Sequence, residues 1–301
     1  MRRSSFPFNL LPILVIGSCT MPSTPERPEV HGHRGCRGLL PENTVAAFLK
    51  AAELGCDRLE LDVVITGDGE VLVSHEPWME HRICLTEEGT PLTEAEGRAA
   101  NIYRMTVDQV QSYDCGSKQH PDFPGQVNAE DHKPTLTEVV EAVENEGMMR
   151  GWGVQSYNIE IKSEPQLYDV MQPRPGPFAE KVMALIEELG IADRCIIQSF
   201  DPAVLEAVHG IDDTMATALL VDNSDGVEAN LQRLSFTPTY YSAEFPLMDA
   251  RAVASLREQG IEPLVWTVNE EADMRAMIAL GLNGIITDYP DRLIRILDEN
   301  E

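Results

Sequence analysis

The amino-acid sequence predicts an α/β fold, a TIM-type (β/α)8 barrel that forms one domain over residues 30–301. Short β-rich runs alternate with helical patterns along most of the chain, and repeated strand-then-helix units imply a parallel sheet. Of the 301 residues, 43% are hydrophobic, enough to bury one large core. Single barrels commonly have about 250 residues, so one domain is the expected organisation.

Nine β-rich runs are predicted strands, and one of them lies outside the barrel. The Asp68-Gly69 turn in TGDGE joins the second and third runs as a hairpin, so the third is expected to be antiparallel. Eight parallel strands remain, as a barrel of this type requires. The predicted strands are residues 30–33, 58–65, 71–75, 157–161, 195–199, 216–221, 240–244, 263–268 and 284–287.

Helical patterns fill most of the gaps between the strands. Asn43 is expected to cap the first helix, and glycines follow the ends of several others. The predicted helices are residues 44–54, 137–145, 178–189, 202–209, 249–259 and 270–280. Between residues 76 and 134 the alternation is lost and turn residues accumulate. This composition predicts an insertion after the hairpin, with one helix near residues 106–113.

The first residues have the composition of an export signal. Arg2 and Arg3 precede an apolar run that is too short and too broken by proline to span a bilayer, which predicts a cleaved signal peptide over residues 1–18. The ending Ile-Gly-Ser-Cys resembles the lipobox of bacterial lipoproteins, with Cys19 as the lipidated residue. Residues 19–29 have the composition of an extended tether. We expect a chain in the cell envelope or periplasm, lipid-anchored at Cys19; a soluble periplasmic or secreted chain is the alternative.

The chain is strongly acidic. Its 50 acidic and 23 basic residues give a net charge of −27, which repels the phosphates of nucleic acid. We therefore expect no nucleic acid among the partners, and membrane contact only through the anchor. If the substrate is itself an anion, a metal ion or a few placed cations must reverse the sign of the potential locally.

The cysteine pattern gives no sign of a structural metal site. Beyond Cys19 the chain has an odd number of cysteines and no Cys-x-x-Cys pair, which argues against structural zinc and against a dense disulfide framework. Cys84 and Cys115 could pair in an oxidising compartment, but the pattern favours free buried thiols.

Acidic residues interrupt two strands in the same way. Glu60 and Asp62 alternate with apolar residues in RLELDVV, and Glu160 alternates with isoleucines in YNIEIKS. With a side-chain period of two, the apolar set faces the helices and the acidic set faces the lumen. Carboxylates that converge at a barrel mouth repel one another unless a cation lies among them, and oxygen ligands favour Mg²⁺ or Ca²⁺ over Zn²⁺. Buried salt bridges to Lys162 and arginine are the alternative.

Two histidines stand where strands meet loops. His33 ends the first strand and His75 ends the hairpin strand, so both suit general acid and base work beside a metal. Arg34 and Lys162 are cations suited to an anionic oxygen such as phosphate. The other histidines, including His31 and His120, are interpreted as structural.

Several longer stretches occur in an order and spacing that resemble the glycerophosphodiester phosphodiesterase family. They extend from residue 30 to about residue 297 and are GHRGCRGLLPENTVAAF, LELDVVITGDGEVLVSHEPW, NIEIK, QSF, VWTVN and GIITDYPDRL. The resemblance implies a TIM barrel that hydrolyses glycerophosphodiesters to sn-glycerol 3-phosphate and an alcohol, using one divalent cation, Mg²⁺ or Ca²⁺. Glu76 departs from the pattern, because aspartate commonly follows the family's second histidine.

The resemblance also implies a role for each candidate residue. The roles are cation binding by Glu60, Asp62 and Glu160, acid and base catalysis by His33 and His75, and substrate or phosphate binding by Arg34, Lys162, Gln198 and Trp266. Asn269 is expected to cap a helix, while Asp288 has a turn role or a site role. In the mechanism usually assigned to the family, the substrate's own glycerol hydroxyl attacks phosphorus and water then opens a cyclic phosphate.

Two other functions are compatible with the same scaffold. The barrel could act on a larger lipid phosphodiester, as a phospholipase D-like or phosphoinositide-type enzyme, or it could be a non-catalytic surface-binding protein. All the proposed site residues are present, which favours a phosphoric diester hydrolase.

Overall fold

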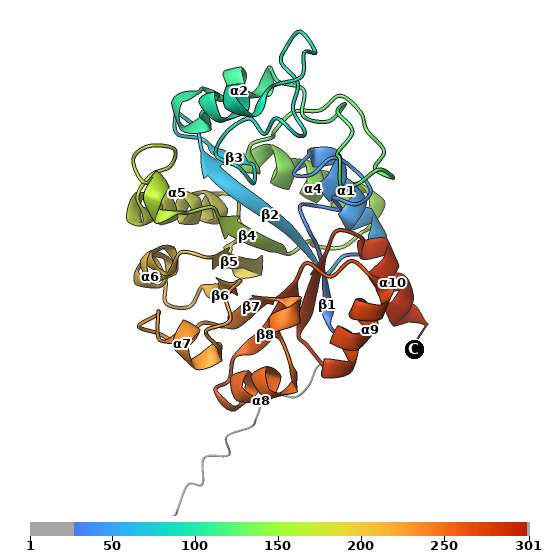
Figure 1. Ribbon diagram of the computed structural model, residues 1–301, viewed down its shortest axis with the longest axis vertical. Helices are drawn as coiled ribbons and strands as arrows, with labels where there is room; N and C mark the ends of the chain where they lie inside the picture. Colours follow the sequence, from blue (N-terminus) through green and yellow to red (C-terminus); the bar gives the residue numbers. More distant parts are fainter. Residues whose placement is uncertain (1–26, 300–301) are drawn as a thin grey trace, which may run out of the picture.

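A closed barrel of eight parallel strands forms the centre of the molecule (Figure 1). The computed structural model describes residues 27–299, so the predicted signal peptide, Cys19 and most of the tether lie outside the described residues. The strands are β1 (Glu29–Gly32), β2 (Arg58–Ile65), β3 (Val71–Val73), β4 (Tyr157–Ile161), β5 (Cys195–Ser199), β6 (Ala216–Val221), β7 (Tyr240–Glu244), β8 (Glu262–Trp266) and β9 (Gly284–Thr287). Pairing of β1 with both β2 and β9 closes the barrel, and β3 lies antiparallel on β2. The predicted (β/α)8 fold and its hairpin are confirmed.

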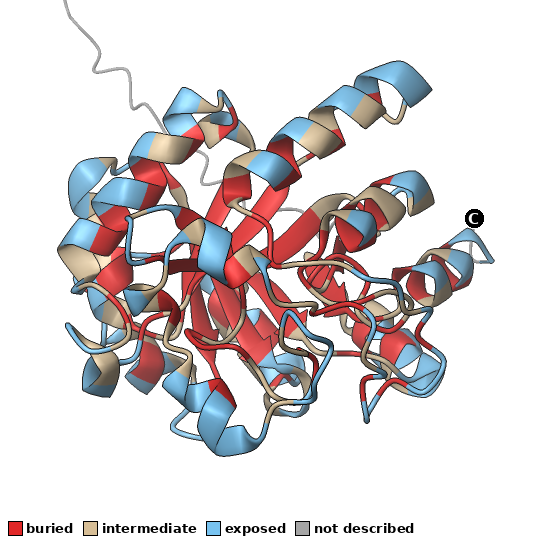
Figure 2. Cartoon of the chain, turned by 90° about the horizontal axis from the view of Figure 1, so that it is seen from above, coloured by how far each residue is buried: buried red, intermediate tan, exposed pale blue. Residues whose placement is uncertain are grey.

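Helices surround the barrel and cover its outer face (Figure 2). They are α1 (Val45–Leu54), α4 (Leu136–Arg150), α5 (Pro175–Glu188), α6 (Pro202–Ile211), α7 (Val227–Leu231), α8 (Ala250–Glu258), α9 (Glu271–Leu280) and α10 (Pro290–Asp298). The short helices α7 and α10 were not predicted, and α4 is longer than its predicted range. None of the helices described over residues 27–299 has the length and apolarity needed to cross a membrane.

The main core lies between the strands and the helices. Leu59, Leu61 and Val63 of β2 face outward and are fully buried, together with Phe48 of α1 and Val182 of α5. A fully buried leucine or phenylalanine contributes about 1.5 to 3 kcal/mol to folding, so this layer fixes the strands against the helices. Because side chains alternate along a strand, the polar residues of β2 face the lumen.

The start of α1 differs from the prediction. Thr44 is the N-cap, since its Oγ1 accepts a hydrogen bond from Ala47 N at 3.2 Å. Asn43 has a left-handed φ of 57°, and its Nδ2 donates to Asp62 Oδ2 at 2.9 Å. The predicted capping role of Asn43 is therefore wrong; its amide supports an acidic residue of the lumen instead.

The insertion between β3 and α4 is compact. It carries α2 (Glu94–Ala99), α3 (Val107–Gln111) and a small apolar cluster that includes Met79, Ile102 and Val110. Cys84 and Cys115 lie in this cluster and form a disulfide, so the expectation of free thiols was wrong for these two. The insertion folds back on itself and brings together segments 31 residues apart, which the spacing alone could not reveal.

The insertion also contacts the loop that follows β1. Gln126 Nε2 donates to the carbonyl oxygens of Arg37 and Leu40, at 2.7 and 2.9 Å. The Phe123 ring lies 4.8 Å from the guanidinium of Arg37. The insertion therefore supports one side of the barrel mouth, beside the residues that β1 delivers there.

Candidate active site

The three predicted carboxylates converge at the barrel mouth. Glu60 and Asp62 come from β2 and Glu160 from β4, where Asp62 and Glu160 are direct neighbours in the parallel register. One oxygen from each carboxylate lies within 4.8 Å of the others, and all three residues are buried. The alternating pattern of β2 thus delivers two acidic side chains to one place in the lumen.

Burial and mutual repulsion oppose ionisation of all three carboxylates at once. Burial and the neighbouring Asp62 raise the pKa of Glu60 well above its usual range. Burial also raises the pKa of Glu160 to about 7, although Lys162 opposes the shift. For Asp62, Arg34 and Lys162 outweigh burial and lower the pKa. A buried, oxygen-only donor set of this kind fits a hard divalent cation.

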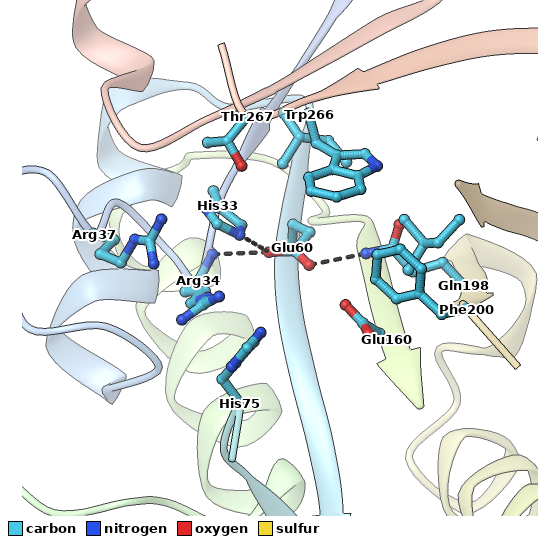
Figure 3. A pocket seen from close by; sticks show the side chains of 12 residues that line it. His33, Arg34, Arg37, Glu60, His75, Glu160, Gln198, Phe200, Trp266 and Thr267 are labelled. Carbon is cyan, nitrogen blue, oxygen red and sulfur yellow. Dashed lines mark hydrogen bonds and ion pairs between the residues drawn. The ribbon is translucent and has the colours of Figure 1, made fainter. Parts of the chain in front are cut away.

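Both oxygens of Glu60 accept hydrogen bonds (Figure 3). The backbone N–H of Arg34 donates to Oε2 at 2.9 Å, and Gln198 Nε2 donates to Oε1 at 2.9 Å. Arg34 reaches this position through a left-handed φ of 49°. The next residue is glycine for a steric reason, because a Cβ at Gly35 would lie 2.7 Å from the backbone carbon of Ala47.

His33 presents one ring nitrogen to the site and uses the other to bind a carboxylate. Its Nδ1 lies 2.6 Å from Asp288 Oδ1, and its Nε2 lies 3.9 Å from Glu60 Oε2. Asp288 also accepts hydrogen bonds from Arg37 Nε at 2.8 Å and from Asn269 Nδ2 at 2.7 Å. Burial opposes ionisation of Asp288, but His33 and Arg37 lower its pKa far below the usual range. An ionised Asp288 therefore fixes the proton of His33 on Nδ1.

This network bears on two sequence expectations. Asp288 lies in the candidate site, where it is the hydrogen-bond partner of His33. Asn269 does not cap α9: Glu270 occupies that position, while Asn269 holds the Asp288 carboxylate.

His75 has the same arrangement with different partners. Its Nδ1 lies 2.8 Å from Glu76 Oε1, and its Nε2 lies 3.1 Å from Lys162 Nζ. Since Lys162 can only donate, Nε2 of His75 accepts, and the ring proton is on Nδ1. Burial, with Arg34 and Lys162, lowers the pKa of His75 well below its usual range, which favours the neutral ring. The longer arm of Glu76 thus reaches the histidine that precedes it.

The two predicted phosphate-binding cations lie against the acidic cluster. Lys162 Nζ is 2.7 Å from Glu160 Oε1. Arg34 Nη1 is 2.7 Å from Glu42 Oε1, and its Nε, 3.4 Å from Asp62 Oδ2, has no hydrogen-bond partner. Glu42 also lies near Arg37 and His120, at 3.6 and 3.8 Å. Sequence reasoning missed Arg37 as a member of the network, although Arg37 belongs to the HRGCRGLLPENT stretch; a place near the site was expected for Glu42.

A cavity of about 210 Å³ joins these groups. His33, His75 and Arg34 lie on one side of it, and Trp266 and Phe200 lie on the other (Figure 3). The Trp266 ring packs edge-on against Phe200, with centroids 5.5 Å apart, and its Nε1 donates to Ser242 O at 3.0 Å. Seven of the nine predicted site residues line the cavity; Asp62 and Lys162 lie directly behind it, against Glu160 and Arg34.

The chain is similar to known proteins over most of its length. Residues 33–292 match the Glycerophosphoryl diester phosphodiesterase family. A glycerophosphodiester phosphodiesterase of Caldanaerobacter subterraneus is 31% identical over 272 residues, covering 89% of this chain and 97% of the relative. The human lysophospholipase D GDPD1 is 25% identical over 276 residues, covering 87% of this chain and 83% of the relative.

Solved structures have the same fold. An Oleispira antarctica phosphodiesterase, solved in complex with sn-glycerol-3-phosphate, has a TM-score of 0.71 and 22% identity, covering 90% of this chain and 97% of that one. A Thermotoga maritima glycerophosphodiester phosphodiesterase has a TM-score of 0.62 and 24% identity, covering 90% and 99%. With the family match over most of the chain and the buried acidic and histidine site, these findings identify a phosphoric diester hydrolase, and the chain belongs to the glycerophosphoryl diester phosphodiesterase family.

Proposed function

We propose that the chain hydrolyses small glycerophosphodiesters to sn-glycerol 3-phosphate and an alcohol, with a divalent cation bound by Glu60, Asp62 and Glu160. The observation that carries the proposal is the pair of histidines. His33 and His75 each bind a carboxylate through Nδ1, which leaves Nε2 of His33 facing Glu60 and Nε2 of His75 accepting from Lys162, beside the acidic cluster. Two neutral imidazoles so placed suit removal of one proton and delivery of another.

The side chains divide the chemistry among them. Mg²⁺ or Ca²⁺ at the three carboxylates would supply positive charge to the phosphoryl oxygens when bound. One histidine takes the proton of the substrate's glycerol 2-hydroxyl, whose oxygen attacks phosphorus. The other protonates the oxygen of the departing alcohol, and water then opens the cyclic phosphate. Arg34 and Lys162 offset the negative charge of the phosphoryl oxygens. Without these cations, the net negative charge of the chain would repel those oxygens.

The opposite wall of the cavity contacts the rest of the substrate. Trp266 and Phe200 present ring surface there, and we assign Trp266 to the glycerol or the headgroup. Gln198 also borders the cavity, but its amide is bonded to Glu60, which favours a role at the carboxylate over the predicted phosphate contact.

A larger lipid phosphodiester is the second candidate substrate. Leu220 and Ile286 extend the apolar wall, and the human lysophospholipase D is similar over 87% of this chain. An acyl chain could use such a wall, whereas a small diester needs only the part near Trp266.

We also propose that the chain is exported and anchored by lipid at Cys19. The Cys84–Cys115 disulfide supports an oxidising compartment such as the periplasm, because disulfides are rare in proteins kept in the reducing cytosol.

The test of the function is a turnover assay on glycerophosphocholine, glycerophosphoethanolamine and lysophosphatidylcholine. The protein is assayed as purified, after EDTA, and after return of Mg²⁺ or Ca²⁺. We expect turnover of the two small diesters, its loss in EDTA, and its recovery with one of the metals. His33→Ala should lower kcat by at least about 100-fold, whereas His132→Ala, on the partly exposed surface of the insertion, should not. Activity that survives thorough removal of metal would overturn the carboxylate site, and a preference for lysophosphatidylcholine would favour the second candidate.

A further inference from the structure

A string of polar side chains crosses the barrel interior beneath the acidic cluster. It starts at Glu29, at the opening of β1, and continues through His31, Asn158 of β4 and Gln198 of β5 to Glu60. Successive donor and acceptor atoms are 3.1, 3.3, 3.2 and 2.9 Å apart. His31, Asn158, Gln198 and Glu60 are all at most 2% exposed, so bulk water cannot replace a missing partner.

The two ends of the string determine the direction of every hydrogen bond in it. Glu29 accepts only, because its pKa is lowered to about 2: burial opposes ionisation, but His31 and Arg58 outweigh it. Glu60 accepts only whenever it holds a cation, since a metal-bound carboxylate is ionised. A string that ends in two acceptors must contain a double donor, and Asn158 is that donor. Its Nδ2 gives one hydrogen to His31 Nδ1 and the other to Gln198 Oε1.

The remaining groups follow from this arrangement. His31 accepts at Nδ1 and donates from Nε2 to Glu29, as a neutral ring does; burial lowers its pKa. With Oε1 of Gln198 engaged by Asn158, only its NH₂ group faces Glu60. A reversed Gln198 amide would set its oxygen against the carboxylate and repel it. In this orientation both hydrogens of Asn158 Nδ2 are used, while its Oδ1 has no hydrogen-bond partner.

We propose that Gln198 is a positioning residue for the cation ligand Glu60, with its amide direction set by Asn158 and His31; the inference rests on the proposed metal site. Gln198 restrains one oxygen of Glu60 and the Arg34 backbone restrains the other, so both oxygens of the carboxylate are held in place. Partners of this kind around a metal ligand commonly alter metal affinity by about 10- to 100-fold. His31 thus influences Glu60 from the other end of the barrel interior, through the side-chain amides of Asn158 and Gln198.

The experiment measures binding of Mg²⁺ and of Ca²⁺ alone, by calorimetry, on the metal-stripped full chain. Gln198→Met keeps the length of the side chain and removes the donor, and we expect it to weaken the Kd of the metal by about tenfold or more. Asn158→Leu keeps Gln198 but removes the hydrogen bond that sets the orientation of its amide. It should weaken metal binding by a smaller factor than Gln198→Met. Ser242→Ala is the matched control, because Ser242 is equally buried in the lumen and its Oγ has no partner.

Kinetics then separate positioning from substrate binding. At saturating metal, Gln198→Met should recover kcat to within a few-fold and keep the KM for glycerophosphocholine. An unchanged metal Kd in both Gln198→Met and Asn158→Leu would overturn the inference, as would a KM that stays raised at saturating metal. If the wild type itself binds neither metal, the proposed metal site fails instead. Circular dichroism of the metal-free variants identifies any that do not fold. If either Gln198→Met or Asn158→Leu fails to fold, the metal Kd of the remaining variant tests the inference.

Discussion

His33 and His75 reach the same arrangement from unrelated parts of the chain. Each directs Nδ1 to a carboxylate, but the carboxylate of His75 is the next residue, whereas that of His33 is 255 residues away. The carboxylate of a histidine pair holds the ring and its tautomer without itself taking the proton. In the proposed function, Asp288 and Glu76 therefore act on catalysis through the histidines.

The role of Asp288 gives a first prediction. Asp288→Asn keeps the shape but can donate to His33 Nδ1, which would move the ring proton to Nε2. We expect kcat to fall by about 10²- to 10⁴-fold, in line with the same change in a serine-protease triad, while the metal Kd stays unchanged. Asp201→Asn is the control, because Asp201 is also buried but binds Ser163 and Tyr168. A similar loss in both variants would show that the effect is structural.

Glu42 gives a prediction for the pH dependence of stability. Burial opposes its ionisation, but Arg34 and Arg37 lower its pKa to about 2, against about 4.3 in an unfolded chain. Ionised Glu42 therefore stabilises the fold fully above about pH 4.3, and this contribution is lost as the pH falls toward 2. At pH 7, Glu42→Gln should lower the free energy of unfolding by up to about 3 kcal/mol.

Urea unfolding of the wild type and Glu42→Gln across this pH range checks the sign. The difference between the two should shrink as the pH falls from about 5 to 2. A difference that is independent of pH would mean that the carboxylate charge is not the stabilising feature.

Among single residues, the sequence identified those that depart from the composition expected of their own strand. Glu60, Asp62 and Glu160 were found because acidic residues are out of place in a buried strand. Asp288 was left between a turn role and a site role, because its importance comes from a tertiary contact that no local pattern reports. Arg37 was missed for the same reason: an arginine in a loop is ordinary until its partners are known.

Strands were predicted more accurately than helix ends. The bounds of β2, β4 and β5 match the prediction, because apolar runs bounded by turn signals define buried strands closely. The start of α1 was misplaced by one residue, since Asn43 and Thr44 are both good caps and only the Asn43 contact with Asp62 decides between them. The helix α10 begins at Pro290, three residues after the end of β9, and was not predicted.

The insertion is the element whose stability depends on a covalent link. The disulfide closes a loop of 31 residues, and loss of such a link costs about 3 to 4 kcal/mol when chain entropy dominates. The double variant Cys84→Ser/Cys115→Ser should lower the free energy of unfolding in urea by about this amount. It should also speed proteolysis between residues 84 and 115. Dithiothreitol should destabilise the wild type but not the double variant; equal sensitivity of the two would exclude the disulfide as the cause.

The whole molecule opposes the approach of anions. Raising the ionic strength from 0.01 to 0.15 M shortens the screening length from about 30 to about 8 Å, which weakens the field of a chain of net charge −27. We expect kcat/KM for glycerophosphoglycerol, a net anion, to rise several-fold with NaCl at fixed metal. The zwitterion glycerophosphocholine should respond little. A fall for the anion would show that Arg34, Lys162 and the cation dominate the field at the mouth.

Attachment to the envelope is tested with one substitution. Cys19→Ser removes the atom that lipidation requires, so the protein should move from the membrane fraction to the soluble fraction of its host. Thr20→Ser, one residue further along, should stay with the membranes. Retention of the Cys19→Ser protein on membranes would assign the attachment to another feature.

The direction of β1 determines how the barrel mouth of an enzyme anchored at Cys19 would be oriented relative to the membrane. The strand starts at Glu29, next to the tether, and delivers His33 at the opposite end of the barrel. From Glu29 to His33 the four residues of β1 rise about 13 Å, so the mouth opens at the end of the barrel opposite the point of attachment. The mouth of an enzyme held in this way would face the aqueous space. Its substrates would be soluble molecules, such as headgroups already freed from their acyl chains. A bilayer lipid would have to leave its membrane to be cleaved.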